Sequence, residues 1–302
     1  MPDHAREIAG NFYSILRDEV IEGNPRLSPA EQRSLQGHYG LMMATKDQPS
    51  LVIGEVYIGR RAEPVREILR SKVPVVFDAG CGYGSESYLF ASLGAQVIAV
   101  DRSENQIEIA RKRMKYFEER LEKELRITFL VADLNTYQPS TDNLSLTWVA
   151  SVLAAMPDQD DFLRRVYAAT RPGGAVMITD MNLGNPLFLV NEWRRRRNNM
   201  RRSRAFRYEA DYAGMLSRTK RSGARYFPTE EGPIVDDVQF FTAGTLGRLL
   251  QKQGFHVLKP HWFGFLPPRA NRHTRLILER VFSKLPAIRA MGYFYLLAGI
   301  KA

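Results

Sequence analysis

The chain has 302 residues, and its 44% hydrophobic and 25% charged content is that of a folded globular protein, which excludes a largely disordered chain. No apolar run reaches the roughly 18 residues that span a bilayer, and residues 1–10 lack the apolar core of a signal peptide, so we expect a cytoplasmic protein. The net charge of +10 comes from one segment, because residues 194–225 hold twelve Lys or Arg against two acids.

The N-terminal segment, residues 1–60, has the pattern of helices but too few apolar residues for a core of its own. We interpret it as a helical lid on a larger domain that spans residues 61–302. Two stretches of that domain, residues 181–241 and 263–290, depart from its regular pattern and are interpreted as insertions that cap the substrate.

Between residues 73 and 180, apolar strand-like runs alternate with amphipathic helix-like runs, which predicts an α/β fold with a doubly wound parallel sheet. The strands are predicted at Val73–Phe77, Gln96–Val100, Arg126–Val131, Leu144–Ala150 and Ala175–Asp180. Ser103 followed by Gln106 has the pattern of a capping box and predicts a helix start. A helix near Asp158–Thr170 is expected to end at "RPGG".

The alternation returns near the C-terminus. We predict a helix over Thr242–Gln253, a strand in "FHVLKPHW" and a last strand in "YFYLLAGIK".

The segment "VVFDAGCGYGSES", residues 75–87, is a buried apolar strand that runs into three glycines. Without β-carbons, backbone amides at the start of the next helix can approach a ligand closely. A P-loop is excluded because no "GK" is followed by Ser or Thr, and the third glycine of a dinucleotide fingerprint is replaced by Ser85. Cys81, the only cysteine, excludes an internal disulfide and is interpreted as a small loop residue.

Three aspartates follow or end the first three predicted strands. Asp78 would repel a pyrophosphate and attract a cofactor that carries an amine and a sulfonium charge. Asp101 ends the second strand, where a carboxylate can accept hydrogen bonds from both hydroxyls of a ribose. Asp133 comes after the third strand, within reach of an adenine amino group.

In this order and spacing, "FDAGCGYGSES", "VIAVDRS", "VADLN" and "RPGGAVMITD" resemble the class I S-adenosylmethionine-dependent methyltransferases, particularly the small-molecule branch that contains quinone-biosynthesis enzymes. The resemblance implies a Rossmann-like, seven-stranded, mostly parallel sheet with an antiparallel last strand, and S-adenosyl-L-methionine as cofactor. The residues it implies for cofactor binding are Asp78, Gly80, Cys81, Gly82, Gly84, Asp101, Arg102, Asp133, Leu134 and Ser151.

The segment after the fourth strand, "TWVASVLAAMPD", lacks the patterns of enzymes that methylate nucleic-acid bases. It is similar to the small-molecule branch, except that Ala155 stands where that branch often has a histidine. The catalytic base, where one is needed, is therefore unassigned, with His38 and His261 as the candidates and a surface or core role as the alternative for each. No metal cluster is predicted.

In a doubly wound sheet the ligand crevice lies beyond the carboxyl ends of the strands, where both insertions emerge. Candidate substrate-binding residues are Tyr39, Trp193, Arg197 and Trp262. The arginine-rich residues 194–225 are either a solvated surface or a site for an anionic group of the substrate or of a membrane surface.

The function predicted from the sequence is methyl transfer from S-adenosylmethionine to an oxygen or nitrogen of a small molecule, preferably one that is lipophilic or bears an acid. One alternative is an RNA methyltransferase that uses the arginine-rich segment. The other is a non-catalytic protein that binds the cofactor, which the absent histidine allows.

Overall fold

The structure is a computed structural model of the chain. The described residues are 2–43, 73–185, 223–227, 234–238, 241–263, 277, 278, 281, 282, 285, 288, 291, 292 and 294–302.

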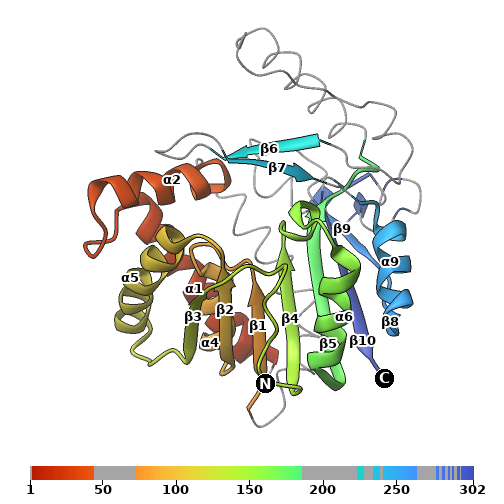
Figure 1. The fold of residues 1–302 in the computed structure, drawn as a ribbon. Coiled ribbons are helices and arrows are strands. Elements are labelled where there is room, and N and C mark those ends of the chain that lie inside the picture. The colour runs from red at the N-terminus through yellow and green to blue at the C-terminus, as the bar shows by residue number, and fades with distance from the viewer. Residues whose placement is uncertain are drawn as a thin grey trace, which may run out of the picture.

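The centre of the molecule is one mostly parallel sheet with the strand order β3-β2-β1-β4-β5-β10-β8, and β9 also pairs with β10 (Figure 1). Its strands are β1 (Val75–Ala79), β2 (Gln96–Asp101), β3 (Ile127–Val131), β4 (Leu144–Ala150), β5 (Thr170–Met181), β8 (Phe255–Val257), β9 (His261–Phe263) and β10 (Phe294–Lys301). The first five strands are mutually parallel and β10 is antiparallel to β5. The predicted fold class is therefore confirmed.

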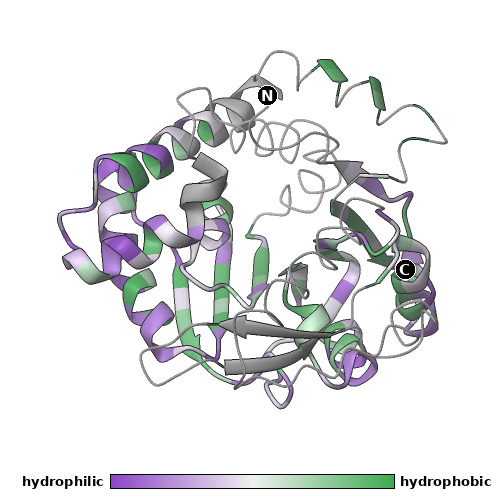
Figure 2. Cartoon of the chain, turned by 90° about the horizontal axis from the view of Figure 1, so that it is seen from above, coloured by the Kyte–Doolittle hydropathy of each residue, from purple (hydrophilic) through white to green (hydrophobic). Residues whose placement is uncertain are grey.

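Helices cover both faces of this sheet. They are α1 (Pro2–Ile21), α2 (Pro29–Met43), α4 (Ser85–Ser92), α5 (Glu104–Leu121), the short 3-10 helix η1 (Leu153–Ala155), α6 (Gln159–Ala169) and α9 (Ala243–Lys252). Apolar residues of α1, α4 and α5 share one buried cluster with one face of the sheet, and those of α6 and α9 share a second cluster with the other face. Figure 2 shows the result as green strands surrounded by helices that carry both green and purple residues.

Polar side chains cap four of these helices at their first turns, and for α2 the cap is Ser28, whose Oγ accepts the Glu31 amide. Ser103 Oγ accepts the Gln106 amide, and the caps of α6 and α9 are made in the same way by Asp158 and Thr242. The helix start predicted at Ser103 is thus confirmed. The second arm of the capping box is not made, because the Ser103 amide donates to Asp101 Oδ1 over 2.9 Å.

Strand β1 lies two residues further along the chain than its predicted bounds, Val73–Phe77, and β2 and β3 differ from theirs by one residue. Two other strands differ more. Strand β5 begins at Thr170, so Pro172 and the glycines after it lie inside the strand, next to an irregularity in its pairing with β4. The strand predicted in "FHVLKPHW" is divided into β8 and β9, with Pro260 in the interruption, because proline has no amide hydrogen for the ladder. Both parts pair with β10, so together they take the place of one of the seven predicted strands.

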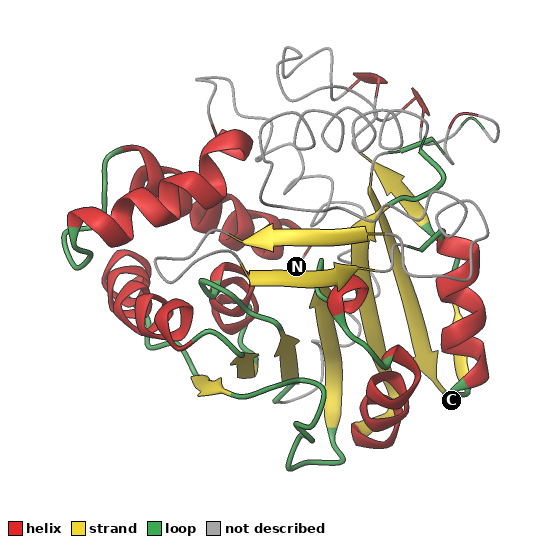
Figure 3. Cartoon of the chain, turned by 45° about the horizontal axis from the view of Figure 1, so that its top comes forward, coloured by secondary structure: helices red, strands yellow, loops and turns green. Residues whose placement is uncertain are grey.

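A two-stranded antiparallel sheet, which the sequence pattern did not predict, lies within residues 181–241, the segment interpreted from the sequence as an insertion. It consists of β6 (Gly223–Phe227) and β7 (Ile234–Val238). Strand β7 approaches η1, which follows β4, and the pair crosses above the carboxyl ends of the parallel strands (Figure 3). Within the described residues, no helix is both long and apolar enough to cross a membrane.

Candidate active site

The loop between β1 and α4, residues 80–84, has three glycines in the left-handed region of backbone conformation. Their φ values are 78° at Gly80, 51° at Gly82 and 79° at Gly84. The Gly80 and Cys81 amides both donate to the Val100 carbonyl at the end of β2. A β-carbon on residue 80 would lie 2.2 Å from Val152 Cγ2, so only glycine fits between this loop and the segment after β4. This is the point where the strand order of the sheet reverses.

Cys81 lies at the start of this loop and is buried. Burial raises the pKa of its thiol, and the nearby carboxylates Asp78 and Asp101 raise that pKa further. The thiol stays protonated at neutral pH, which excludes a thiolate nucleophile at this position.

Asp101 links the glycine loop to the next helix. Its Oδ2 accepts the Gly82 amide and its Oδ1 accepts the Ser103 amide, each over 2.9 Å. A carboxylate has about four acceptor positions, so each oxygen keeps capacity for a further donor. The half-buried side chain is thus held in a fixed orientation at the carboxyl end of β2.

Asp78 and Glu86 add two more carboxyl groups to the neighbourhood of the loop. Asp78 is 2% exposed and accepts a hydrogen bond from Ser87 Oγ. Burial raises the pKa of Asp78 to about 8, and the charge of Glu86 acts in the same direction. Burial also raises the pKa of Glu86, while Arg113 opposes that shift. A bound cation would stabilise the ionised forms of Asp78 and Glu86, and the Asp101 carboxylate lies beside them, so this end of the sheet favours a positively charged ligand.

Asp133 follows β3 and is exposed. Its Oδ1 accepts the Asn135 amide over 2.9 Å, which closes a tight turn. Arg165 of α6 binds the backbone of this turn. Its Nη2 donates to the carbonyls of Leu134 and Asn135, each over 2.9 Å, and its Nη1 donates to the Tyr137 carbonyl. Leu134 itself is buried.

Two other residues of the predicted cofactor set lie at the same edge of the sheet. Arg102 is exposed beside Asp101, at the end of β2. Ser151, directly after β4, is exposed and has a φ of 57°, a conformation that non-glycine residues rarely adopt. Its amide donates to the Thr179 carbonyl of β5 over 2.8 Å. Local strain of this kind is common at ligand sites.

The candidate bases lie on different sides of the molecule. His38 of α2 makes an edge contact with Tyr83 of the glycine loop, with ring centroids 5.1 Å apart. Desolvation and the charge of Arg113 lower the pKa of His38. His261 is exposed on β9, and Trp262 beside it is half-buried. The strands β4, β5 and β10 separate these two residues from the glycine loop after β1.

The other candidate substrate residues fall outside what the structure describes. Trp193 and Arg197 lie outside the described residues, as does the side chain of Tyr39. Among the described residues, no group of three or more His, Cys, Asp or Glu could hold a metal ion.

Sequence reasoning missed Glu86, Arg113 and Arg165. Glu86 had a local signal, because it lies in the first turn of the helix that follows the glycines. The two arginines had none, since each contacts a loop that is far from it in the sequence.

Comparison with known proteins relates one segment of this chain to a known domain type. Residues 76–174 match the family model of a methyltransferase domain. The chain is 35% identical over 107 residues to the methyltransferase GfsG of Streptomyces halstedii, and the aligned residues make up 35% of this chain and 37% of that protein. It is 30% identical over 129 residues to the trans-aconitate 2-methyltransferase of Variovorax paradoxus, and the aligned residues make up 40% of this chain and 46% of that protein. The chain therefore matches less than half of the length of these curated relatives.

A solved structure shares the fold. It is that of a SAM-dependent methyltransferase from Methanosarcina mazei, which is 15% identical with a TM-score of 0.53 and covers 79% of this chain and 97% of that chain.

Proposed function

We propose that this chain, whose residues 76–174 match the model of a methyltransferase domain, is a class I enzyme that transfers a methyl group from S-adenosylmethionine to an oxygen or nitrogen of a small molecule. The observation that carries the proposal is the glycine loop with its three surrounding carboxyl groups, Asp78, Glu86 and Asp101. A cationic cofactor would stabilise the ionised forms of these side chains, whereas a pyrophosphate would disfavour them.

Each side of the site has a proposed role in holding the cofactor. The glycine loop leaves space for the methionine part, with Asp78 and Glu86 as counter-charges for its ammonium group. Asp101 is proposed to accept hydrogen bonds from the ribose hydroxyls, because its two oxygens are already oriented by the Gly82 and Ser103 amides. The turn at Asp133 and Leu134 lies at the end of β3, where it is proposed to border the adenine.

When bound, the cofactor would supply an electrophilic methyl group, with the neutral thioether of S-adenosylhomocysteine as the leaving group. The protein then mainly has to position the acceptor atom in line with the bond between that methyl group and its sulfur and keep water out. An acceptor that is already an anion needs no base, so Ala155 in place of a histidine is compatible with catalysis. An acceptor hydroxyl would need one, and His38 is the candidate nearest the glycine loop.

The proposed acceptor is a small molecule that is lipophilic or bears an acidic group. Two facts support an acid. The chain carries twelve Lys or Arg within residues 194–225, and one of its relatives is named for trans-aconitate, an organic acid. The β6–β7 pair lies in the same insertion and above the carboxyl ends of the strands, where an acceptor would enter.

The test combines binding with product detection. The purified chain is titrated with S-adenosylmethionine and S-adenosylhomocysteine by calorimetry, and is then incubated with S-adenosylmethionine and a small-molecule extract of its host. We expect binding of both ligands and extract products that are heavier by one CH2 unit, absent with Asp101→Ala. A parallel incubation with RNA and S-adenosylmethionine labelled in its methyl group tests the RNA alternative, which transfer of the label to RNA would support. Cofactor binding without any S-adenosylhomocysteine formation would contradict catalysis.

A further inference from the structure

Arg113, on α5, is a charged residue buried at the centre of the α1, α4 and α5 layer. Its side chain is fully buried, as is that of Glu19 on α1. Arg113 Nε and Nη2 donate to the two carboxylate oxygens of Glu19 over 2.9 and 2.6 Å. Asn24 Nδ2 donates to the same carboxylate over 2.7 Å. A buried charge is stable only where it is paired and fully hydrogen-bonded, and this pair meets that condition.

The other side of the Arg113 guanidinium contacts the glycine loop. Its Nη1 donates to the Tyr83 carbonyl, and Nη1 and Nη2 both donate to Ser85 Oγ over 3.2 Å. With residues that the structure describes, the guanidinium makes five hydrogen bonds, which equals its number of N–H donors. Its acceptors are a carboxylate of α1 on one side and two groups around Gly84 on the other.

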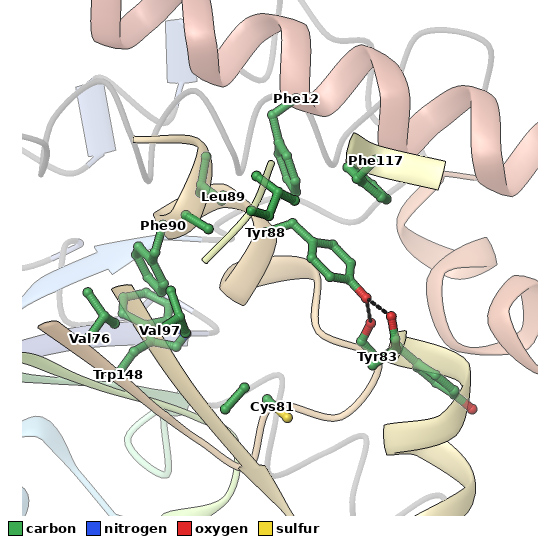
Figure 4. Close-up of a cluster of buried hydrophobic side chains, with 14 of the residues drawn as sticks. Phe12, Val76, Cys81, Tyr83, Tyr88, Leu89, Phe90, Val97, Phe117 and Trp148 are labelled. Carbon is green, nitrogen blue, oxygen red and sulfur yellow. Dashed lines mark hydrogen bonds between the residues drawn. The ribbon is translucent and has the colours of Figure 1, made fainter. Parts of the chain in front are cut away.

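The N-terminal helices approach the same loop by a second route. Tyr83 Oη shares a hydrogen bond with Ser34 Oγ of α2 over 2.7 Å. The Tyr83 carbonyl also accepts Tyr88 Oη over 3.1 Å, and the Tyr88 ring stacks on Phe117. Figure 4 shows Tyr88 between Phe12 of α1 and the Tyr83 carbonyl. Tyr83 is thus held by residues from α2, α4 and α5.

We propose that the first N-terminal helix is part of the cofactor site, with Glu19 and Arg113 as positioning residues that fix the glycine loop for the methionine end of the cofactor. This inference rests on the proposed function. Gly84, between the two acceptors, has its φ at 79°, and its amide donates to Cys81. Without Arg113 the carbonyl of Tyr83 and the hydroxyl of Ser85 lose their charged donor, so this turn can leave the conformation that receives the ligand.

A neighbouring ion pair supplies the matched control. Lys112 also connects α5 to the N-terminal helices, because its Nζ lies 2.6 Å from Glu31 Oε1 of α2 and 3.0 Å from Glu108 Oε1. None of its described contacts involves the glycine loop. Lys112→Met therefore removes a link between the same layers and leaves the loop contacts of Arg113 in place.

The experiment compares two ligands that differ in the part held by the loop. S-adenosylhomocysteine has the amino-acid part, and 5′-methylthioadenosine lacks it. The variants are Ser85→Ala, Arg113→Lys and Glu19→Gln, with Lys112→Met as control, and each is titrated by calorimetry after its melting temperature is measured. We expect Arg113→Lys and Glu19→Gln to lower the affinity for S-adenosylhomocysteine about tenfold, because hydrogen bonds to a charged group are lost. The affinity for methylthioadenosine should fall less than twofold.

Ser85→Ala keeps the buried ion pair intact and guards against variants that fail to fold. It is expected to weaken S-adenosylhomocysteine several-fold with the same selectivity. Equal weakening of both ligands, or no weakening in any folded variant, would overturn the inference and leave the proposed function standing. A wild-type chain that binds neither ligand would overturn the proposed function, and the inference with it.

Discussion

Gly82 donates its backbone amide to Asp101 Oδ2, so the glycine loop and the end of β2 form one hydrogen-bonded unit. Asp101→Ala removes both a proposed ligand contact and the group that orients the loop. We expect it to weaken S-adenosylhomocysteine at least tenfold, because a charge-assisted hydrogen bond contributes about 1.5–3 kcal/mol. Calorimetry checks this, with the exposed first-turn residue Glu104→Ala as control. An Asp101→Ala affinity equal to that of wild type would remove Asp101 from the site.

Gly80→Ala tests the contact between the glycine loop and the segment after β4. The alanine meets an unfavourable φ, which costs about 1–3 kcal/mol, and overlaps with Val152 Cγ2, which costs a further 1–3 kcal/mol or so. Gly173→Ala is the matched control, because Gly173 also has a positive φ, at 71°, but no atom lies within 4 Å of its added Cβ.

Urea unfolding of both variants should therefore show Gly80→Ala as the less stable. The double variant Gly80→Ala, Val152→Ala is expected to recover part of the loss by removing the overlap. Equal stabilities for Gly80→Ala and Gly173→Ala would show that the loop can move away from Val152.

Asp78 predicts a pH dependence of stability in the absence of cofactor. Burial raises the pKa of Asp78 to about 8, above the value of 3.8 expected for the unfolded chain. Between these values the folded state holds a proton that the unfolded state has lost, so the contribution of this group to stability falls as the pH rises. Asp78→Asn carries no such proton. Relative to wild type, we expect the variant to gain roughly 1.4 kcal/mol in free energy of unfolding per pH unit within this window.

Urea unfolding at pH 5, 6 and 7 measures this trend. A stability difference between Asp78→Asn and wild type that is constant over these pH values would show that Asp78 is ionised in the folded protein. The same variant should bind S-adenosylhomocysteine more weakly, because it cannot become the counter-charge of the ligand's ammonium group.

Local signals in the sequence were sufficient for the central sheet and its glycine loop. Apolar runs marked β1 to β5, and Ser103 marked the start of α5, because these features depend on neighbouring residues. The acids at the strand ends could be read in the same way, since the carboxyl ends of parallel strands meet at one edge. Their ligand contacts stay predictions.

The residues that support the loop could not be found in this way. Arg113 looks like one more charge on a helix with many charges, and its partner Glu19 is 94 residues away. Only the packing of α1 against α4 and α5 brings them together. The β6–β7 pair was missed for a different reason, because its strands lie beside an arginine-rich stretch whose composition suggested a solvated segment.

Arg165 has the same relation to the turn at Asp133 that Arg113 has to the glycine loop, which predicts a different ligand selectivity. Arg165→Lys keeps the charge but loses the planar fork that reaches three carbonyl groups and Asp161. Because the turn borders the proposed adenine site, S-adenosylhomocysteine and methylthioadenosine should both weaken, each about five- to tenfold. Arg164→Lys is the control, since Arg164 also pairs with Asp161 but is 67% exposed.

Methylthioadenosine affinity that stays at the wild-type value would place the adenine elsewhere. Loss of both ligands here, beside selective loss of S-adenosylhomocysteine on changing Arg113, would assign the two ends of the cofactor to two separately supported loops.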